Sequence, residues 1–123
     1  MATDDDIERE IQAKGLTAPR VTPESIEAKI KSEHYFTAGE GLQGANPEFV
    51  AYPNSLDRLT ICILVLENGF TILGKSAPAS ASNFDAEIGK KIARADAVNQ
   101  IWPLEGYLLR ETLHLDAQIA EGQ

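Results

Sequence analysis

The sequence is poor in the residues that cross-link small secreted proteins or hold metal ions. Its single cysteine, Cys62, excludes an intramolecular disulfide. Its two histidines, His34 and His114, have no carboxylate or thiol at metal-binding spacing, so we expect no metal site. The N-terminus lacks the basic and apolar segments of a secretory signal, and the longest apolar run, Ile61 to Leu66, is far shorter than the ~20 residues of a membrane span. These absences predict a cytoplasmic protein without membrane contact.

Positive charge is also scarce. Lys and Arg number 11 against 19 Asp and Glu, which gives a net charge of -8. A chain of this charge repels the phosphates of DNA, RNA and anionic membranes, so these are excluded as partners. The acidic residues gather at the two ends, whereas residues 55–110 are neutral and carry most of the apolar pattern. Since 123 residues suffice for one small domain, we expect a flexible acidic arm over residues 1–20 and a single α+β domain over residues 21–123.

The first half of this domain contains one helix signal and one loop signal. Thr22 is a good N-cap and precedes Pro23, so a short helix is predicted to begin there. Residues 34–37 are expected to form a short strand. Residues 39–47 are rich in turn-forming residues and are expected to form a loop.

Residues 59–67 and 70–75 predict a β-hairpin, because they flank the dipeptide Asn68-Gly69, which favours a type I′ turn. The first strand is apolar on both faces, with Leu59, Ile61, Ile63 and Val65 on one face and Cys62, Leu64 and Leu66 on the other. One face can be covered by the chain's own helices. A second subunit is the favoured cover for the other face, although a helix on each side stays open as an alternative.

Residues 83–117 predict a helix, capped by Ser82 or Asn83 and kinked or interrupted at Pro103. Apolar residues recur on one stripe at three- and four-residue steps: Phe84, Ile88, Ile92, Ala95, Val98 and Trp102. Opposite them, small residues lie four apart, a spacing that favours close helix contact between subunits: Gly89, Ala93 and Ala97. We therefore expect a kinked C-terminal helix pair packed on a small antiparallel sheet in a homo-oligomer.

No enzyme signature stands out. Cys62 lies in an apolar strand, where a reactive thiolate is disfavoured, and the pattern Gly39-x-Gly-x-x-Gly44 lacks the surrounding strand, turn and helix of a nucleotide loop. The basic residues of the central segment are Arg58, Lys91, Arg94 and Arg110, and an aromatic residue, Phe84, lies among them in the sequence. Arginine pairs with phosphate, an aromatic ring stacks on a base, and a helix start near Asn83 would offer unpaired amides. The alternative for each cation is a solvated or ion-paired side chain.

Three segments resemble a known family, over about residues 55–112. They are Leu59-Thr-Ile-Cys through Asn68-Gly-Phe, Asn83-Phe-Asp-Ala-Glu-Ile-Gly-Lys-Lys-Ile-Ala with Asp96-Ala, and Ile101-Trp-Pro-Leu-Glu-Gly-Tyr-Leu-Leu-Arg-Glu. They look like the small tailed-phage family of gene-product-49-like proteins. A hairpin followed by a kinked helix pair in an oligomeric phage protein also resembles the first-described type of Thoeris anti-defence sponge proteins.

This resemblance implies a protein that binds a cyclic nucleotide without cleaving it, in the cytoplasm of the bacterial host. The ligand would be a cyclic ADP-ribose isomer such as glycocyclic ADP-ribose or, as in some members, a cyclic oligonucleotide, and Thoeris- or CBASS-type immunity would be blocked. Phe84 would stack on the base, and Arg58 and Arg110 would bind phosphate or ribose oxygens at a pocket between subunits of a dimer or larger oligomer, up to a hexamer. Asn83 and Arg94 would be secondary contacts, with Asp96 as an alternative to Arg94.

No cofactor is expected. The main alternative is a phage accessory protein in replication or assembly, whose apolar sheet faces and acidic ends dock a host or phage protein. A cyclic-nucleotide hydrolase is disfavoured, because these residues assemble no metal site or nucleophile.

Overall fold

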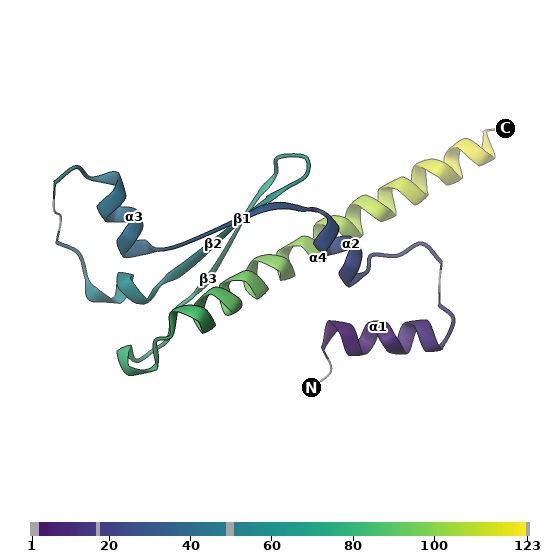
Figure 1. Cartoon of the computed structure of the whole chain (residues 1–123). Coiled ribbons are helices and arrows are strands. Elements are labelled where there is room, and N and C mark those ends of the chain that lie inside the picture. The colour runs from purple at the N-terminus through teal and green to yellow at the C-terminus, as the bar shows by residue number, and fades with distance from the viewer. Residues whose placement is uncertain (1–2, 17, 49–50, 123) are drawn as a thin grey trace. The chain divides into compact units, whose positions relative to one another are not determined.

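The computed structural model describes residues 3–16, 18–48 and 51–122, and its fold is α+β as the sequence predicts (Figure 1). The chain divides into two compact units. One is Ile30–Gln100, and the other combines Met1–Lys29 with Ile101–Gln123. The larger unit holds a three-stranded sheet, helix α3 and the first turns of helix α4, and it contains most of the buried residues.

The sheet is antiparallel, with the strand order β1-β2-β3. Its strands are β1 (Ile30–Thr37), β2 (Thr60–Leu66) and β3 (Thr71–Ser76). Burial alternates along β2, where Thr60, Cys62, Leu64 and Leu66 are buried and the residues between them are half-buried. The prediction that both faces of this strand are apolar is confirmed, and one of the two faces is fully covered within the chain.

The predicted hairpin joins β2 to β3, but its turn is not type I′. Among the described residues with positive φ, Gly69 is the one in this turn, and Asn68 is not among them. The amide of Gly69 donates to the carbonyl of Leu66, and the amide of Leu66 donates to the carbonyl of Phe70. These bonds define a three-residue loop in which glycine supplies the left-handed residue. The side chain of Asn68 instead accepts a hydrogen bond from the amide of Phe70.

Helix α4 (Ala86–Glu121) packs on the covered face of the sheet through its small residues. A Cβ at Gly74 of β3 would lie 2.1 Å from the carbonyl oxygen of Ala93 and 2.6 Å from the amide nitrogen of Ala97. A Cβ at Gly89 would lie 2.8 Å from the hydroxyl of Thr60. The prediction that this small-residue row serves contact between subunits is therefore wrong, because the row brings the helix onto the chain's own sheet.

The large apolar residues of the predicted stripe of this helix lie outside the core. Ile88 and Ile92 are 55% and 52% exposed, and Phe84, Val98 and Trp102 are half-buried. On the other face of the sheet, Leu73 of β3 is 58% exposed. Large apolar side chains thus remain accessible to solvent on α4 and on β3.

Pro103 lies inside α4, which continues without interruption from Ala86 to Glu121. The predicted division into two helical parts is not found. Proline removes one intrahelical hydrogen bond, but the residues on either side are good helix formers, and Pro103 is exposed to solvent. The helix therefore tolerates the loss of one bond.

Residues 38–45 form helix α3 (Ala38–Ala45), where the sequence predicted a loop. A capping box explains the helix: the hydroxyl of Thr37 accepts from the amide of Glu40, and the carboxylate of Glu40 accepts from the amide of Thr37. Gly39 is buried against the short helix η1 (Asn54–Arg58), since a Cβ there would meet the carboxylate of Asp57. The Gly-x-Gly-x-x-Gly pattern thus lies inside a helix and forms no phosphate-binding loop.

The outer edge of β3 is closed by two side chains of α4. A carboxylate oxygen of Asp96 accepts a 3.0 Å hydrogen bond from the amide of Lys75, and the side-chain amide of Gln100 donates a 2.7 Å bond to the carbonyl of Leu73. Backbone groups of an edge strand otherwise invite pairing with another chain. These two bonds make strand addition at this edge unfavourable.

The second unit contains helix α1 (Asp4–Ala13), helix α2 (Pro23–Ala28) and the later turns of α4. The N-cap Thr22 of α2 is confirmed, and Ile26 of that helix is buried. The sequence assigned no element to residues 1–20, whereas α1 forms there behind a capping box from Thr3; residues 1, 2 and 17 lie outside the described residues. Arg20 forms an ion pair with Glu8. No helix in the described ranges is both long and apolar enough to span a membrane.

Candidate functional site

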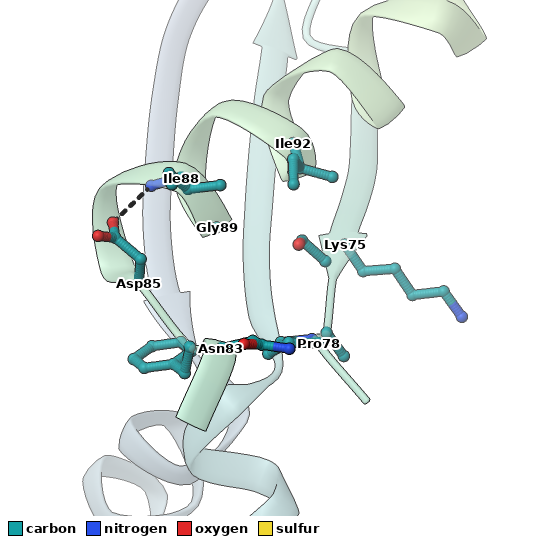
Figure 2. A pocket seen from close by; sticks show the side chains of 10 residues that line it. Lys75, Pro78, Asn83, Asp85, Ile88, Gly89 and Ile92 are labelled. Atoms are coloured by element: carbon teal, nitrogen blue, oxygen red, sulfur yellow. Dashed lines mark hydrogen bonds between the residues drawn. The ribbon is translucent and has the colours of Figure 1, made fainter. Parts of the chain in front are cut away.

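A pocket lies between the end of β3 and the start of α4, within the unit Ile30–Gln100 (Figure 2). Its volume is about 380 Å³, within the range of small-molecule sites. Its walls come from three consecutive segments: Lys75 to Pro78 at the end of β3, Asn83 to Asp85 next to the short helix η2 (Ala81–Asn83), and Ile88, Gly89 and Ile92 of α4. Phe84 and Asn83, both predicted as ligand contacts, therefore line the same pocket.

The start of α4 differs from the sequence prediction in a way that changes the chemistry of this pocket. The helix begins at Ala86, and a carboxylate oxygen of Asp85 accepts a 3.0 Å hydrogen bond from the amide of Ile88. Asp85 is therefore the N-cap, and the predicted caps Ser82 and Asn83 precede the helix. Of the unpaired amides predicted at the helix start, one is therefore already occupied by this carboxylate.

The pocket is mainly apolar, and the one ionic side chain at its helix end is an acid. Lys75 is one of the lining residues, and its side chain extends away from Ile88 and Asp85 (Figure 2). The sheet register agrees, since Lys75 pairs with Ile61 on the face of the sheet that α4 does not cover. The polar groups of the pocket are therefore those of Asn83, Asp85 and Ser76, together with backbone groups.

Arg58 lies at the same end of the sheet as the pocket. Thr60 pairs with Ser76 and contacts Gly89, and both of these residues line the pocket. Arg58 precedes Thr60 by two residues, so the two backbones are within about 7 Å. The Nε of Arg58 is buried and has no hydrogen-bond partner in the described part of the chain. A buried donor without an acceptor is costly, which makes this side chain a candidate for binding an oxygen of a ligand.

Arg94 and Asp96, which sequence reasoning left as alternatives for one ligand contact, are both engaged within the protein. The guanidinium of Arg94 contacts the carboxylate of Glu33 in β1 at 3.1 to 3.3 Å, and Asp96 binds the edge of β3. Arg94 and then the hydroxyl of Tyr35 lower the pKa of Glu33 by hydrogen bonding. Neither Arg94 nor Asp96 lines the pocket.

Arg110 belongs to the other unit, where it is exposed on α4. Of the predicted ligand contacts, the structure thus brings Asn83 and Phe84 into one pocket and places Arg58 at the same end of the sheet. The wall formed by residues 76–78 was missed, because the side chains of Ser, Ala and Pro do not suggest ligand binding. The position of this segment directly after the hairpin was the available signal.

The remaining candidates of the sequence do not line the pocket. Cys62 is a buried free thiol, as predicted, and burial raises its pKa. Burial also raises the pKa of Tyr35, with the nearby carboxylate of Glu33 adding to the effect. His34 contacts the hydroxyl of Ser32. Among the residues that the structure describes, no group of three or more His, Cys, Asp or Glu side chains is placed to hold a metal ion.

A family model described as the phage protein (N4 Gp49/phage Sf6 gene 66) family matches residues 21–113, well over half of the chain. The match extends from before α2 through the sheet and the pocket into the later turns of α4. Neither the curated proteins nor the solved structures contain a significant match.

Proposed function

Since the chain belongs to the phage protein family of N4 Gp49 and Sf6 gene 66, we propose that it binds and sequesters a cyclic nucleotide signal of the bacterial host without degrading it. The ligand class is a cyclic ADP-ribose isomer or a cyclic oligonucleotide. Bound in this way, the signal would not reach the effector of a Thoeris- or CBASS-type defence in the host cytoplasm.

The observation that carries this proposal is the joint position of Phe84 and Asn83 in a pocket of about 380 Å³. Phe84 supplies an aromatic ring for stacking on a base, and the amide of Asn83 both donates and accepts hydrogen bonds. Pro78 and Ile88 provide apolar walls that suit the faces of a planar ring. A small nucleotide needs this combination of one stacking surface and a few polar groups.

Two arginines are proposed as further ligand contacts. Arg58 is supported by its buried and unpartnered Nε at the pocket end of the sheet. Arg110 is proposed on the family resemblance alone, as a donor to a phosphate or ribose oxygen. Arg94 is a weaker candidate than the sequence suggested, because its guanidinium holds Glu33.

Oligomerisation is part of the proposal. The side chains of Ile61, Ile63 and Val65 are half-buried on the sheet face opposite α4, and Leu73 beside them is largely exposed. A second copy would remove this apolar surface from water. Light scattering should therefore give a mass of at least twice the 13.4 kDa of one chain. A monomer at micromolar concentration would contradict this part of the proposal.

The test of the site is the binding of cyclic ADP-ribose isomers and cyclic trinucleotides, measured by calorimetry on the wild type and on Phe84→Ala. Losing the stacking surface should weaken binding by roughly 1–3 kcal/mol, or about 5- to 150-fold. Phe70→Ala is the matched control, because it removes the same ring from the hairpin turn, away from the pocket. Equal effects of the two substitutions, or no binding to the wild type, would refute the proposal.

Sequestration also predicts that the ligand is recovered unchanged. Heat denaturation of the complex should release intact cyclic nucleotide, as judged by mass spectrometry. A linear or hydrolysed product would identify an enzyme instead. Arg110→Ala, tested in the same assay, should weaken binding while leaving the fold intact, because a ligand oxygen would lose its charged donor.

A second candidate function is docking of a host or phage protein, favoured by the exposed apolar residues of the later turns of α4. Those more than two-fifths exposed are Leu104, Tyr107, Leu108, Leu115 and Ile119. Surfaces of this kind mark interaction sites on many proteins. If no cyclic nucleotide binds, substitution of Leu108 and Leu115 by Ser should abolish co-purification with the partner while Phe84→Ala leaves it unchanged.

A further inference from the structure

The charge of the pocket restricts which part of a nucleotide can enter it. Its ionic groups are the carboxylate of Asp85 and the ammonium of Lys75, and the Lys75 side chain extends away from the helix end of the pocket (Figure 2). The other lining side chains are neutral, and most are apolar. A phosphate placed against α4 would therefore meet the carboxylate of Asp85, whereas the positive charge of the lining, that of Lys75, lies away from it.

Asp85 also weakens the usual attraction of a helix start for anions. One of its oxygens accepts the hydrogen bond from the amide of Ile88, which is a donor that a phosphate at a helix N-terminus would use. Its other oxygen makes no hydrogen bond among the described residues and remains able to accept one. The same carboxylate thus repels an anion and offers an acceptor to a hydroxyl or amino group.

We infer that this pocket is a nucleoside subsite, which takes the base and ribose of the ligand and excludes its phosphates, and that Asp85 is the specificity-determining residue. The inference rests on the proposed function, which it deepens by assigning one part of the ligand to one part of the protein. The acceptor oxygen of Asp85 pairs with a ribose hydroxyl or an exocyclic amine, and the phosphates lie outside the pocket.

The expected discrimination follows from the distance between charges. One unit charge on a phosphate about 6 Å from the carboxylate, in a medium between bulk water and a protein surface, weakens binding by roughly 3- to 100-fold. Adenosine should therefore bind the wild type more tightly than adenosine 5′-monophosphate by a factor in this range.

The experiment compares these two probes on the wild type, Asp85→Asn and Glu87→Gln, with binding followed by the NMR shifts of the amides of Ile88 and Gly89. Asparagine caps a helix as well as aspartate does, so Asp85→Asn removes the charge and keeps the fold. Glu87→Gln removes the same charge from the same helical turn, at an exposed residue that does not line the pocket.

Asp85→Asn should bring the affinities for adenosine and its monophosphate closer together, mainly by tightening the binding of the monophosphate. Glu87→Gln should change the ratio of the two affinities much less. The inference is overturned if the monophosphate binds the wild type as tightly as adenosine, if Asp85→Asn leaves the ratio unchanged, or if adenosine at millimolar concentration shifts neither amide. Failure of the proposed function is a separate result, namely that no cyclic nucleotide binds the wild type while adenosine is still preferred to its monophosphate.

Discussion

A methyl group at position 74 has no room in this fold. Gly74 faces α4 from β3, and the methyl carbon of an alanine there would lie 2.1 Å from the carbonyl oxygen of Ala93 and 2.6 Å from the amide nitrogen of Ala97. Both obstructing atoms belong to helix backbone, so no side-chain rotation relieves the contact. Gly74→Ala must therefore move the helix away from the sheet or distort the strand.

The size of the effect follows from two opposing contributions. Overpacking a core costs about 1–3 kcal/mol, and contact with backbone places this case at the upper end. Alanine also reduces the entropy of the unfolded chain, which offsets about 0.4–1 kcal/mol. The expected net loss is about 2 kcal/mol, which lowers the Tm of a chain of this size by roughly 6–12 °C.

The assay is urea and thermal unfolding followed by circular dichroism, with Gly106→Ala as the matched control. Gly106 also lies in α4, but a Cβ there would meet no heavy atom within 4 Å. Alanine is the better helix former, so this control should gain about 0.5–1 kcal/mol. An unchanged Tm for Gly74→Ala beside a stabilised control would refute the packing of α4 on β3 through its small residues.

Three further outcomes are expected from charged residues. Asp96→Ala should lower the free energy of unfolding by about 0.5–1.5 kcal/mol and speed hydrogen exchange at the amide of Lys75, since that amide loses its acceptor. An unchanged exchange rate at this amide would contradict the contact between Asp96 and the edge of β3. Because Arg94 holds the pKa of Glu33 below its ordinary 4.5, their interaction stabilises the protein above that pH and is lost as the pH falls through the folded pKa. Glu33→Gln should therefore flatten the acid limb of the stability curve, and an equally steep limb would count against the pair. The pKa of Glu8, held at about 2 by Arg20, should rise toward 4.5 in Arg20→Gln, as measured by NMR titration of the carboxyl carbon; a value unaffected by the substitution would exclude this ion pair in solution.

Local signals in the sequence were sufficient for most of the elements. The Asn68-Gly69 dipeptide between two β-rich runs located the hairpin, and Thr22 before Pro23 located a short helix. The helix over residues 38–45 was missed because its glycines were given more weight than the capping box of Thr37 and Glu40, a signal that was present in the sequence. The predicted type I′ turn was wrong, because the chain forms a three-residue loop, which needs a positive φ at one residue only.

For the candidate site, the sequence indicated the residues but not which of their side chains are available to bind a ligand. Asn83 and Phe84 are adjacent in the chain, so their joint position in the pocket needed little tertiary information. The engagement of Arg94 by Glu33 joins residues 61 positions apart, and no local pattern predicts it. The unpartnered Nε of Arg58 is likewise a property of the packed unit.

The periods of the strands and the helix could be read from the residues alone, because alternation by two and recurrence by three or four are properties of the backbone. Which side of α4 is buried depends instead on how the helix packs on the sheet. Periodicity assigns residues to two faces, the stripe with Ile88 and Ile92 and the row of small residues, and does not say which of them meets the sheet. The glycine at position 74 admits the helix backbone so closely that the row of Gly89, Ala93 and Ala97 packs there instead, because small residues allow the close approach that large side chains prevent.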